Sequence, residues 1–181
     1  MFCRLSYLCA LAVLAGMLAA APSAMAVRAC QSAGATPSNV AKQTVVRATL
    51  CTLNAERDRY GLRPLKLNKQ LSKAARRHAR DMVRRDYFAH DSLSGGTFVD
   101  RIRRAGYLNG ANSWSVGENL AWGSHDRAAP RAITESWMNS AGHRANILSA
   151  SFREVGIGLA IGAPGASGPA ATYATEFGSR G

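Results

Sequence analysis

The sequence predicts an α+β domain in which helices cover a small antiparallel sheet. Helical periodicity dominates the chain up to about residue 148, whereas strand-like segments gather near the C-terminus, and this order favours the α+β class. The chain has 181 residues, of which 47% are apolar and 19% are charged. Such a composition is globular, and about 140 residues remain for one hydrophobic core once poorly ordered N-terminal residues are set aside.

Five helices are expected, at about residues 39–60, 69–86, 98–106, 130–139 and 141–148. Four of them follow a side chain that can cap a helix N-terminus: Ser38, Asn68, Thr97 and Ser140. The helix at 130–139 begins instead with Pro130, because the backbone of proline suits a first turn. Gly61 and Gly106 end the first and third helices, because glycine readily adopts the left-handed conformation. Apolar residues recur at helical spacing, so the second helix has a predicted inner face of Leu71, Ala74, Ala75, His78 and Met82.

Three strands are expected, at residues 116–122, 155–161 and 171–177. Residues 162–169 are rich in glycine and proline and form the loop between the last two strands. Residues 63–65 are extended, since Pro64 disfavours a helix there.

The first 26 residues are typical of a secretory signal peptide. Arg4 provides a positive start, residues 8–21 provide an apolar stretch, and residues 24–26 form an A-x-A cleavage site. We therefore expect cleavage after Ala26, no transmembrane segment thereafter, and a secreted or periplasmic protein.

Two alternatives to cleavage after Ala26 remain open. A membrane-anchoring helix would need about 20 apolar residues, and the apolar run is shorter than that. A lipoprotein would use Cys30, but Arg28 occupies a position where such sites prefer a small or apolar residue. After the signal peptide we expect an N-terminal arm at 27–44, which includes the start of the first helix, and one domain at 45–181.

Cys30 and Cys51 are the two cysteines that remain after cleavage. In an oxidising compartment they are expected to form a disulfide, which would stabilise the fold by about 3 kcal/mol in the chain-entropy model. Two buried thiols are the alternative.

The chain is strongly basic, with 23 Lys and Arg against 11 Asp and Glu. For an exported protein this charge favours an anionic envelope lipid or glycan as partner, rather than nucleic acid, for which no recognition motif is present. Much of the charge lies on the second predicted helix, where a solvated face is the simpler interpretation: Lys73, Arg76, Arg77, Arg80, Arg84 and Arg85.

Two histidines and one acid form the main candidate site. His90 lies in the loop after the second helix, Glu118 lies in an apolar strand, and His143 lies in the first turn of a helix. A buried carboxylate needs partners, because an unpaired one is costly. The three side chains can form a two-histidine, one-carboxylate metal site for Zn²⁺ or Mg²⁺, or a carboxylate–imidazole network that joins strand, loop and helix.

Several motifs, in this order, resemble the CAP superfamily, which comprises the cysteine-rich secretory, antigen 5 and pathogenesis-related 1 proteins and is also called the SCP domain. The resemblance is to its short bacterial form and covers about residues 45–178. The motifs are Leu53-Asn54-Ala55-Glu56-Arg57, Gly117-Glu118-Asn119-Leu120-Ala121, Trp137-Met138-Asn139-Ser140, Gly142-His143-Arg144, Asn146-Ile147-Leu148 and Val155-Gly156-Ile157-Gly158.

The resemblance implies a three-layer α-β-α sandwich with a cleft, and it places there the following residues: His90, Glu118, His143, Ser140 and Asn119. Some family members bind a divalent metal through the two histidines. Eukaryotic members carry a second acid where this chain has Ser140. Glu135 cannot replace it, because five residues separate the two positions by about 140° around a helix.

The expected function is that of a binding or interaction module whose cleft takes a divalent metal or an envelope-derived ligand. The alternative is a hydrolase, either metal-assisted or with Ser140 as nucleophile and His143 as base. No G-x-S-x-G motif supports the serine route, and Ser140 is more simply a helix cap. The sequence assigns no catalytic residue.

Overall fold

The structure is a computed structural model that describes residues 30–181. The predicted signal peptide lies outside the described residues. Among the residues that are described, none of the helices has the length and apolar character that a membrane crossing requires.

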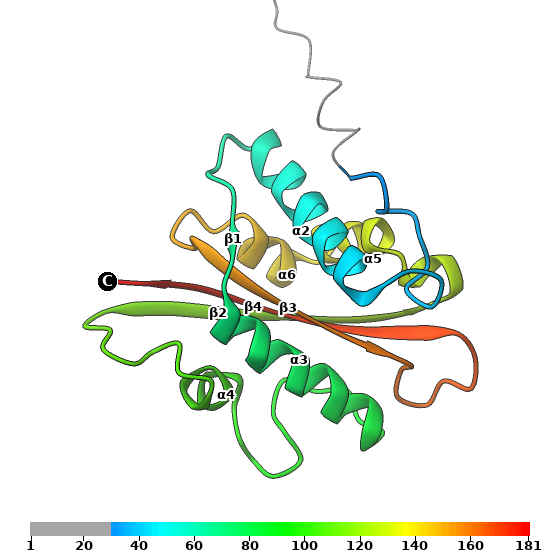
Figure 1. Cartoon of the computed structure of the whole chain (residues 1–181). Helices are drawn as coiled ribbons and strands as arrows, with labels where there is room; N and C mark the ends of the chain where they lie inside the picture. Colours follow the sequence, from blue (N-terminus) through cyan, green and yellow to red (C-terminus); the bar gives the residue numbers. More distant parts are fainter. Residues whose placement is uncertain (1–29) are drawn as a thin grey trace, which may run out of the picture.

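A four-stranded sheet forms the middle layer of the described chain (Figure 1). Its strands are β1 (Lys66–Leu67), β2 (Trp114–Ser124), β3 (Glu154–Ile161) and β4 (Ala170–Arg180), in the spatial order β1-β3-β4-β2. The β3–β4 and β2–β4 pairs are antiparallel, as expected, whereas the two-residue β1 pairs parallel to β3. The sheet is therefore mixed at one edge, because the extended segment after the first helix joins it as a short strand.

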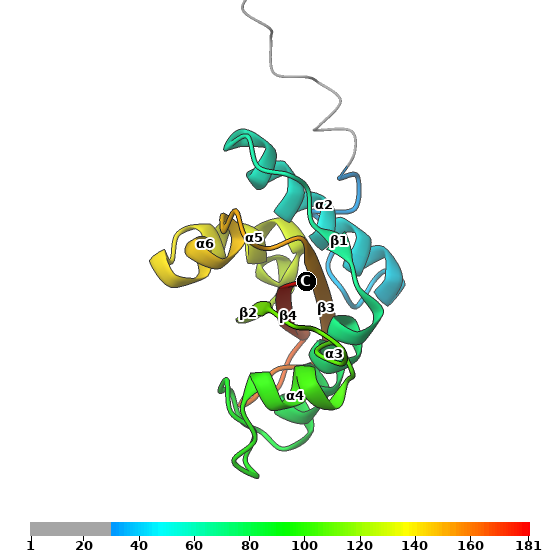
Figure 2. The same cartoon turned by 90° about the vertical axis from the view of Figure 1, so that its left-hand side faces the viewer.

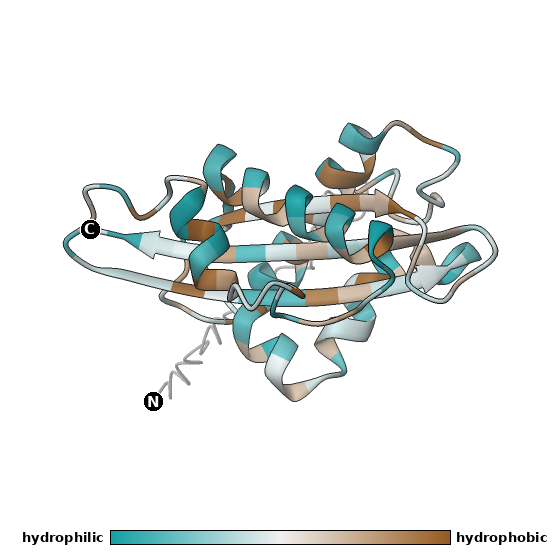
Figure 3. Cartoon of the chain, turned by 90° about the horizontal axis from the view of Figure 1, so that it is seen from below, coloured by the Kyte–Doolittle hydropathy of each residue, from teal (hydrophilic) through white to brown (hydrophobic). Residues whose placement is uncertain are grey.

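Helices cover both faces of the sheet, which confirms the three-layer α-β-α sandwich (Figures 1 and 2). One layer holds α2 (Lys42–Arg59), α5 (Pro130–Met138) and α6 (Ala141–Ile147), and the other holds α3 (Lys69–Arg84) and α4 (Phe98–Arg104). A short 3₁₀ helix, η1 (His125–Ala128), joins β2 to α5. Hydrophilic residues occupy much of the outward surface of the helices, and apolar residues recur along the strands (Figure 3).

Two of the predicted caps are confirmed, whereas the cap predicted at Ser38 is wrong. The Asn68 side chain accepts hydrogen bonds from the first backbone amides of α3, and Thr97 forms a capping box with Asp100. Ser38 does not cap α2, which begins only after Ala41. Ser38 instead lies in a turn, closed by a backbone hydrogen bond from Asn39 to Thr36, and its hydroxyl donates to Asn39 Oδ1 at 3.1 Å.

The disulfide between Cys30 and Cys51 is present. Cys51 lies on α2, so the bond attaches the N-terminal arm to this helix. A backbone hydrogen bond from Arg131 to the Ala33 carbonyl, 2.8 Å long, fixes the same arm to α5.

Two glycines allow α3 to pack directly on β3. A Cβ atom added at Gly158 would lie 2.2 Å from the backbone carbon of Ala75, and one added at Gly156 would lie 2.0 Å from that of Leu71. Both distances are shorter than any normal contact. The alternating glycines of the strand therefore set the distance between this helix and the sheet.

We predict that Gly158→Ala destabilises the fold by about 3 kcal/mol or more, because overpacking against backbone cannot be relieved by a rotamer change. Urea unfolding measures this loss. Gly168→Ala is the matched control, since nothing lies within 4 Å of the added Cβ, and should change stability by less than about 0.5 kcal/mol. Equal stability of the two variants would contradict the direct packing of α3 on β3.

Candidate functional site

Glu118 is the buried centre of the site. Its side chain is 1% exposed, and each of its oxygens accepts a hydrogen bond from a different cation or imidazole. His90 Nδ1 donates to Oε1 at 2.8 Å, and Arg101 Nη2 donates to Oε2 at 2.6 Å. The carboxylate of β2 thus holds the loop that carries His90 and the helix α4 that carries Arg101.

The pKa values of the pair shift in opposite directions. Burial acts to raise the pKa of Glu118, but the hydrogen bond from His90 and the charge of Arg101 outweigh it, so this pKa is lowered. The hydrogen bond to Glu118 raises the pKa of His90 despite partial burial. The ion pair therefore stabilises the fold between the two shifted values. This contribution is lost when the pH falls through the pKa of Glu118 or rises through that of His90.

A second acid, Glu176, lies beside Glu118. The two residues are directly paired across β2 and β4, and Glu176 is fully buried. Burial and the negative charge of Glu118 raise the pKa of Glu176 well above its ordinary value. The shift favours the protonated form of Glu176, and neither of its carboxyl oxygens has a hydrogen-bond partner among residues 30–181. Arg101 lies close to both acids, with its Nε 3.9 Å from Glu176 Oε1.

His143 is held against β2 by backbone and amide contacts. Asn119 Nδ2 donates to the His143 carbonyl at 3.0 Å, and Asn146 Nδ2 donates to the Glu118 carbonyl at 3.1 Å. Gly117 makes this approach feasible, because a Cβ atom there would lie 2.9 Å from Asn146 Oδ1. The first turn of α6 is therefore fixed beside the residue that carries the buried carboxylate.

The two imidazoles interact electrostatically. Partial burial lowers the pKa of His143, and the charge of His90 lowers it further. His143 is therefore neutral at neutral pH, whereas the side chain of His90 is 55% exposed and is backed by Glu118. The structure thus joins His90 to Glu118 and places the backbone of His143 beside the same strand, and we call these three residues the imidazole site.

The other two predicted residues lie nearby but have different surroundings. The Asn119 amide is occupied by α6, since its oxygen also accepts from Asn146 at 2.8 Å. Ser140 occupies the N-cap position of α6, yet its hydroxyl does not cap the helix, so the predicted capping role is wrong. Across residues 30–181 this hydroxyl forms no hydrogen bond with His143 or any other side chain.

The residues do not fit a three-ligand metal site. Both oxygens of Glu118 are already engaged, and His90 Nδ1 is committed to one of them. Within the described part of the chain, no group of three or more His, Cys, Asp or Glu side chains is arranged to hold a metal ion. The two imidazoles, with His90 Nε2 outside the hydrogen bond to Glu118, are the groups that remain for a cation.

Arg101 and Glu176 are the site residues that the sequence did not reveal. Glu176 is the charged residue in the buried part of β4, among apolar residues and threonines, and this is a signal that could have drawn attention to it. Arg101 carries no such signal, because basic residues at helical spacing are usually exposed.

Comparisons with known proteins agree with the fold. A model of the CAP family, described as the cysteine-rich secretory protein family, matches residues 50–175. The Bacillus subtilis protein YkwD is 39% identical over 105 residues, which are 58% of this chain and 38% of that protein.

Two solved structures are also similar. An extracellular protein containing a SCP domain from Bacillus anthracis has 28% identity and a TM-score of 0.60, and the match covers 76% of this chain and 43% of that one. An outer surface protein from Borrelia burgdorferi has 18% identity and a TM-score of 0.63 over 78% of this chain and 97% of that one, a likeness of fold. The chain spans less than half the length of the two Bacillus proteins.

We predict that His90→Ala raises the pKa of His143, because it removes the positive charge that opposes protonation of this ring. In the parent protein, His90 should titrate above the ordinary range of imidazole and His143 below it. Ring-proton NMR titration measures both. The control variant is His125→Ala, which removes a histidine in η1. It should leave the titration midpoint of His143 unchanged. A midpoint of His143 that is unaffected by His90→Ala would show that the rings do not interact.

Proposed function

The chain belongs to the cysteine-rich secretory protein family, and from this premise we propose that it is an exported binding module whose binding groups are the two imidazoles of the imidazole site. Two observations support a location outside the cytoplasm. The Cys30–Cys51 disulfide is typical of proteins in oxidising compartments, and one similar protein is described as extracellular. The predicted cleavage after Ala26 belongs to the same proposal.

One observation carries the proposal: the buried carboxylate of Glu118 accepts a hydrogen bond from the exposed imidazole of His90. Burying an ion pair costs desolvation energy that replacement by apolar residues would avoid. Here Glu118 and Arg101 are both buried, while the His90 ring that they hold is more than half exposed. The hydrogen bond that Nδ1 donates to Glu118 fixes the orientation of the ring and leaves Nε2 to contact a ligand.

The chemistry of the site favours a late transition-metal ion over Mg²⁺. The neutral His143 is a nitrogen donor, and His90 becomes one when the metal ion displaces the proton on its Nε2. Nitrogen donors suit Zn²⁺, whereas Mg²⁺ prefers oxygen ligands. Two protein ligands leave coordination positions open for an envelope-derived ligand. Glu118 would act as a positioning residue and would not itself bind the ion.

The serine route to hydrolysis is not part of the proposal. A nucleophilic serine must be activated by a hydrogen bond to its base. Ser140 and His143 share no such bond in the described residues, and the structure contains no specific feature that favours this chemistry over binding.

We predict that the purified domain takes up Zn²⁺ in equilibrium dialysis, and that His90→Ala and His143→Ala each weaken this uptake by about tenfold or more, since each removes one of two nitrogen donors. Mg²⁺ should not be retained. Ser140→Ala and His125→Ala are the controls, and both should bind Zn²⁺ as the parent does. Zn²⁺ uptake that survives loss of both His90 and His143 would refute this role of the imidazole site.

A further inference from the structure

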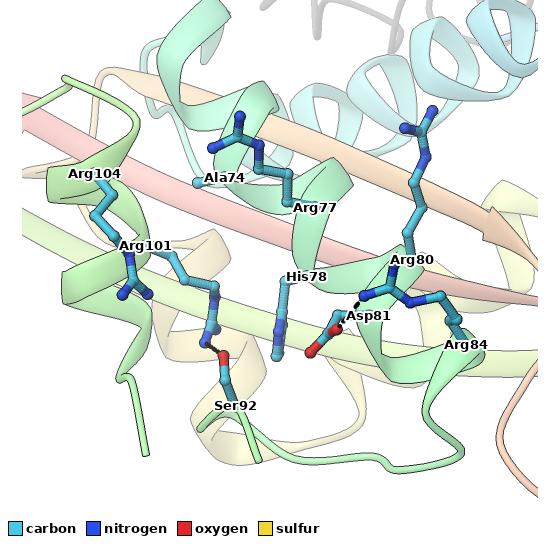
Figure 4. Close-up of a pocket in the computed structure, with 9 residues that line it drawn as sticks. All are labelled: Ala74, Arg77, His78, Arg80, Asp81, Arg84, Ser92, Arg101 and Arg104. Atoms are coloured by element: carbon cyan, nitrogen blue, oxygen red, sulfur yellow. Dashed lines mark hydrogen bonds and ion pairs between the residues drawn. The ribbon is translucent and has the colours of Figure 1, made fainter. Parts of the chain in front are cut away.

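A second cavity lies on the other side of Arg101, between α3, α4 and the loop that carries Ser92 (Figure 4). Its volume is about 380 Å³, which is within the range of roughly 300–1,000 Å³ that ligand pockets span. We call it the arginine pocket, because its lining includes five arginines and a single acid: Ala74, Arg77, His78, Arg80, Asp81, Arg84, Ser92, Arg101 and Arg104.

The single acid of the pocket is already compensated. Asp81 accepts hydrogen bonds from Arg84 at 3.1 Å and from the Tyr87 hydroxyl at 2.7 Å. Arg85 lies 3.8 Å from the same carboxylate. Burial acts to raise the pKa of Asp81, but these partners hold it below its ordinary value. The charge of Asp81 is thus unavailable to the remaining arginines.

Three of the five arginines of the pocket have no anionic partner in the described residues. Arg101 is paired with Glu118, and Arg84 is paired with Asp81. Arg77, Arg80 and Arg104 form no ion pair with any residue in the range 30–181. Arg77 extends from α3 past Ala74 and Arg104 extends from α4 toward Arg101, whereas Arg80 lies apart from both (Figure 4).

His78 adds an unsatisfied acceptor to the wall of the pocket. It is 1% exposed, and its Nε2 is 2.9 Å from the Ala89 carbonyl, so Nε2 carries the hydrogen and Nδ1 has the lone pair. Burial lowers the pKa of His78 and keeps the ring neutral. Nδ1 is buried without a hydrogen-bond partner among the described residues. Such groups usually bind an ordered water or a ligand.

We propose that the arginine pocket binds the phosphate group of an anionic ligand through Arg77 and Arg104. The planar guanidinium group matches phosphate oxygens in a bidentate manner, and arginines from two helices can contact one group from two sides. A phosphate that keeps one proton also supplies a hydroxyl donor, which satisfies His78 Nδ1 directly or through a water. Sulfate supplies the negative charge but no such donor.

This inference goes beyond the imidazole site and does not depend on it. Neither His90 nor His143 lines the arginine pocket. The inference also differs from the solvated face predicted for the basic helix, because arginines of α3 and α4 together enclose one cavity. Loss of phosphate binding and loss of Zn²⁺ binding can therefore be observed separately.

The test uses calorimetry with pyrophosphate and inorganic phosphate on the purified domain. The double variant Arg77→Gln/Arg104→Gln should lose at least about tenfold in affinity, since charge-assisted hydrogen bonds are the strong ones. Arg47→Gln/Arg131→Gln is the matched control, because it removes the same charge from exposed residues in the opposite helical layer. It should retain binding. Sulfate should bind more weakly than phosphate.

Two outcomes would overturn the proposal: no saturable binding of either phosphate probe, or equal losses in the two double variants. Sulfate binding as tight as that of phosphate would overturn the assignment to phosphate. Co-sedimentation with vesicles of phosphatidic acid in phosphatidylcholine distinguishes the sources of the group. If the pocket variant alone fails to sediment, a lipid headgroup is one source. If the parent binds pyrophosphate but not vesicles, the ligand is a soluble phosphate.

Discussion

The hydrogen bonds to the Glu118 carboxylate determine the geometry of the site and of much of the fold around it. One oxygen holds the loop of His90, and the other holds Arg101 of α4. Neither tie is local in sequence, because the partners lie 28 and 17 residues away. A buried carboxylate cannot remain ionised without such partners. Loss of the carboxylate charge would therefore loosen the loop and α4 together and leave Arg101 buried opposite a neutral Glu176.

The free edge of β2 is protected by the layer that carries His143. Asn146 donates to the Glu118 carbonyl, and the Trp137 indole donates to the Leu120 carbonyl at 3.0 Å. These side chains occupy backbone acceptors that an exposed edge strand would offer to another chain. Arg57 of α2 holds the other end of α6, with Nη1 2.7 Å from the Ile147 carbonyl. The same contacts thus close the sheet edge and fix the position of His143.

The helices and the main strands could be predicted from the sequence because their determinants are local, whereas the prediction of the imidazole trio rests on separate motifs in the order typical of a known family. Capping side chains such as Asn68 and Thr97 act within one turn, and they mark the helix starts correctly. The roles of Arg101 and Glu176 could not be predicted in this way. The proximity of Glu176 to Glu118 depends on the register of β2 against β4, and that of Arg101 depends on how α4 docks. The two-residue strand β1 has too few residues to show any periodicity.

Arg101 connects the two sites, since it binds Glu118 with one nitrogen and lines the arginine pocket. The central physical claim therefore concerns the two acids beside Arg101: the pKa of Glu118 is lowered and that of Glu176 is raised. The most direct test is the titration of the side-chain carboxyl carbons of Glu118 and Glu176, followed by ¹³C NMR. Glu118 should remain ionised at a pH below the ordinary range of glutamate, while Glu176 should remain protonated well above it. Titration of both carboxyls within the ordinary range would contradict the opposite pKa shifts of the two acids and the arrangement around Arg101 that depends on them.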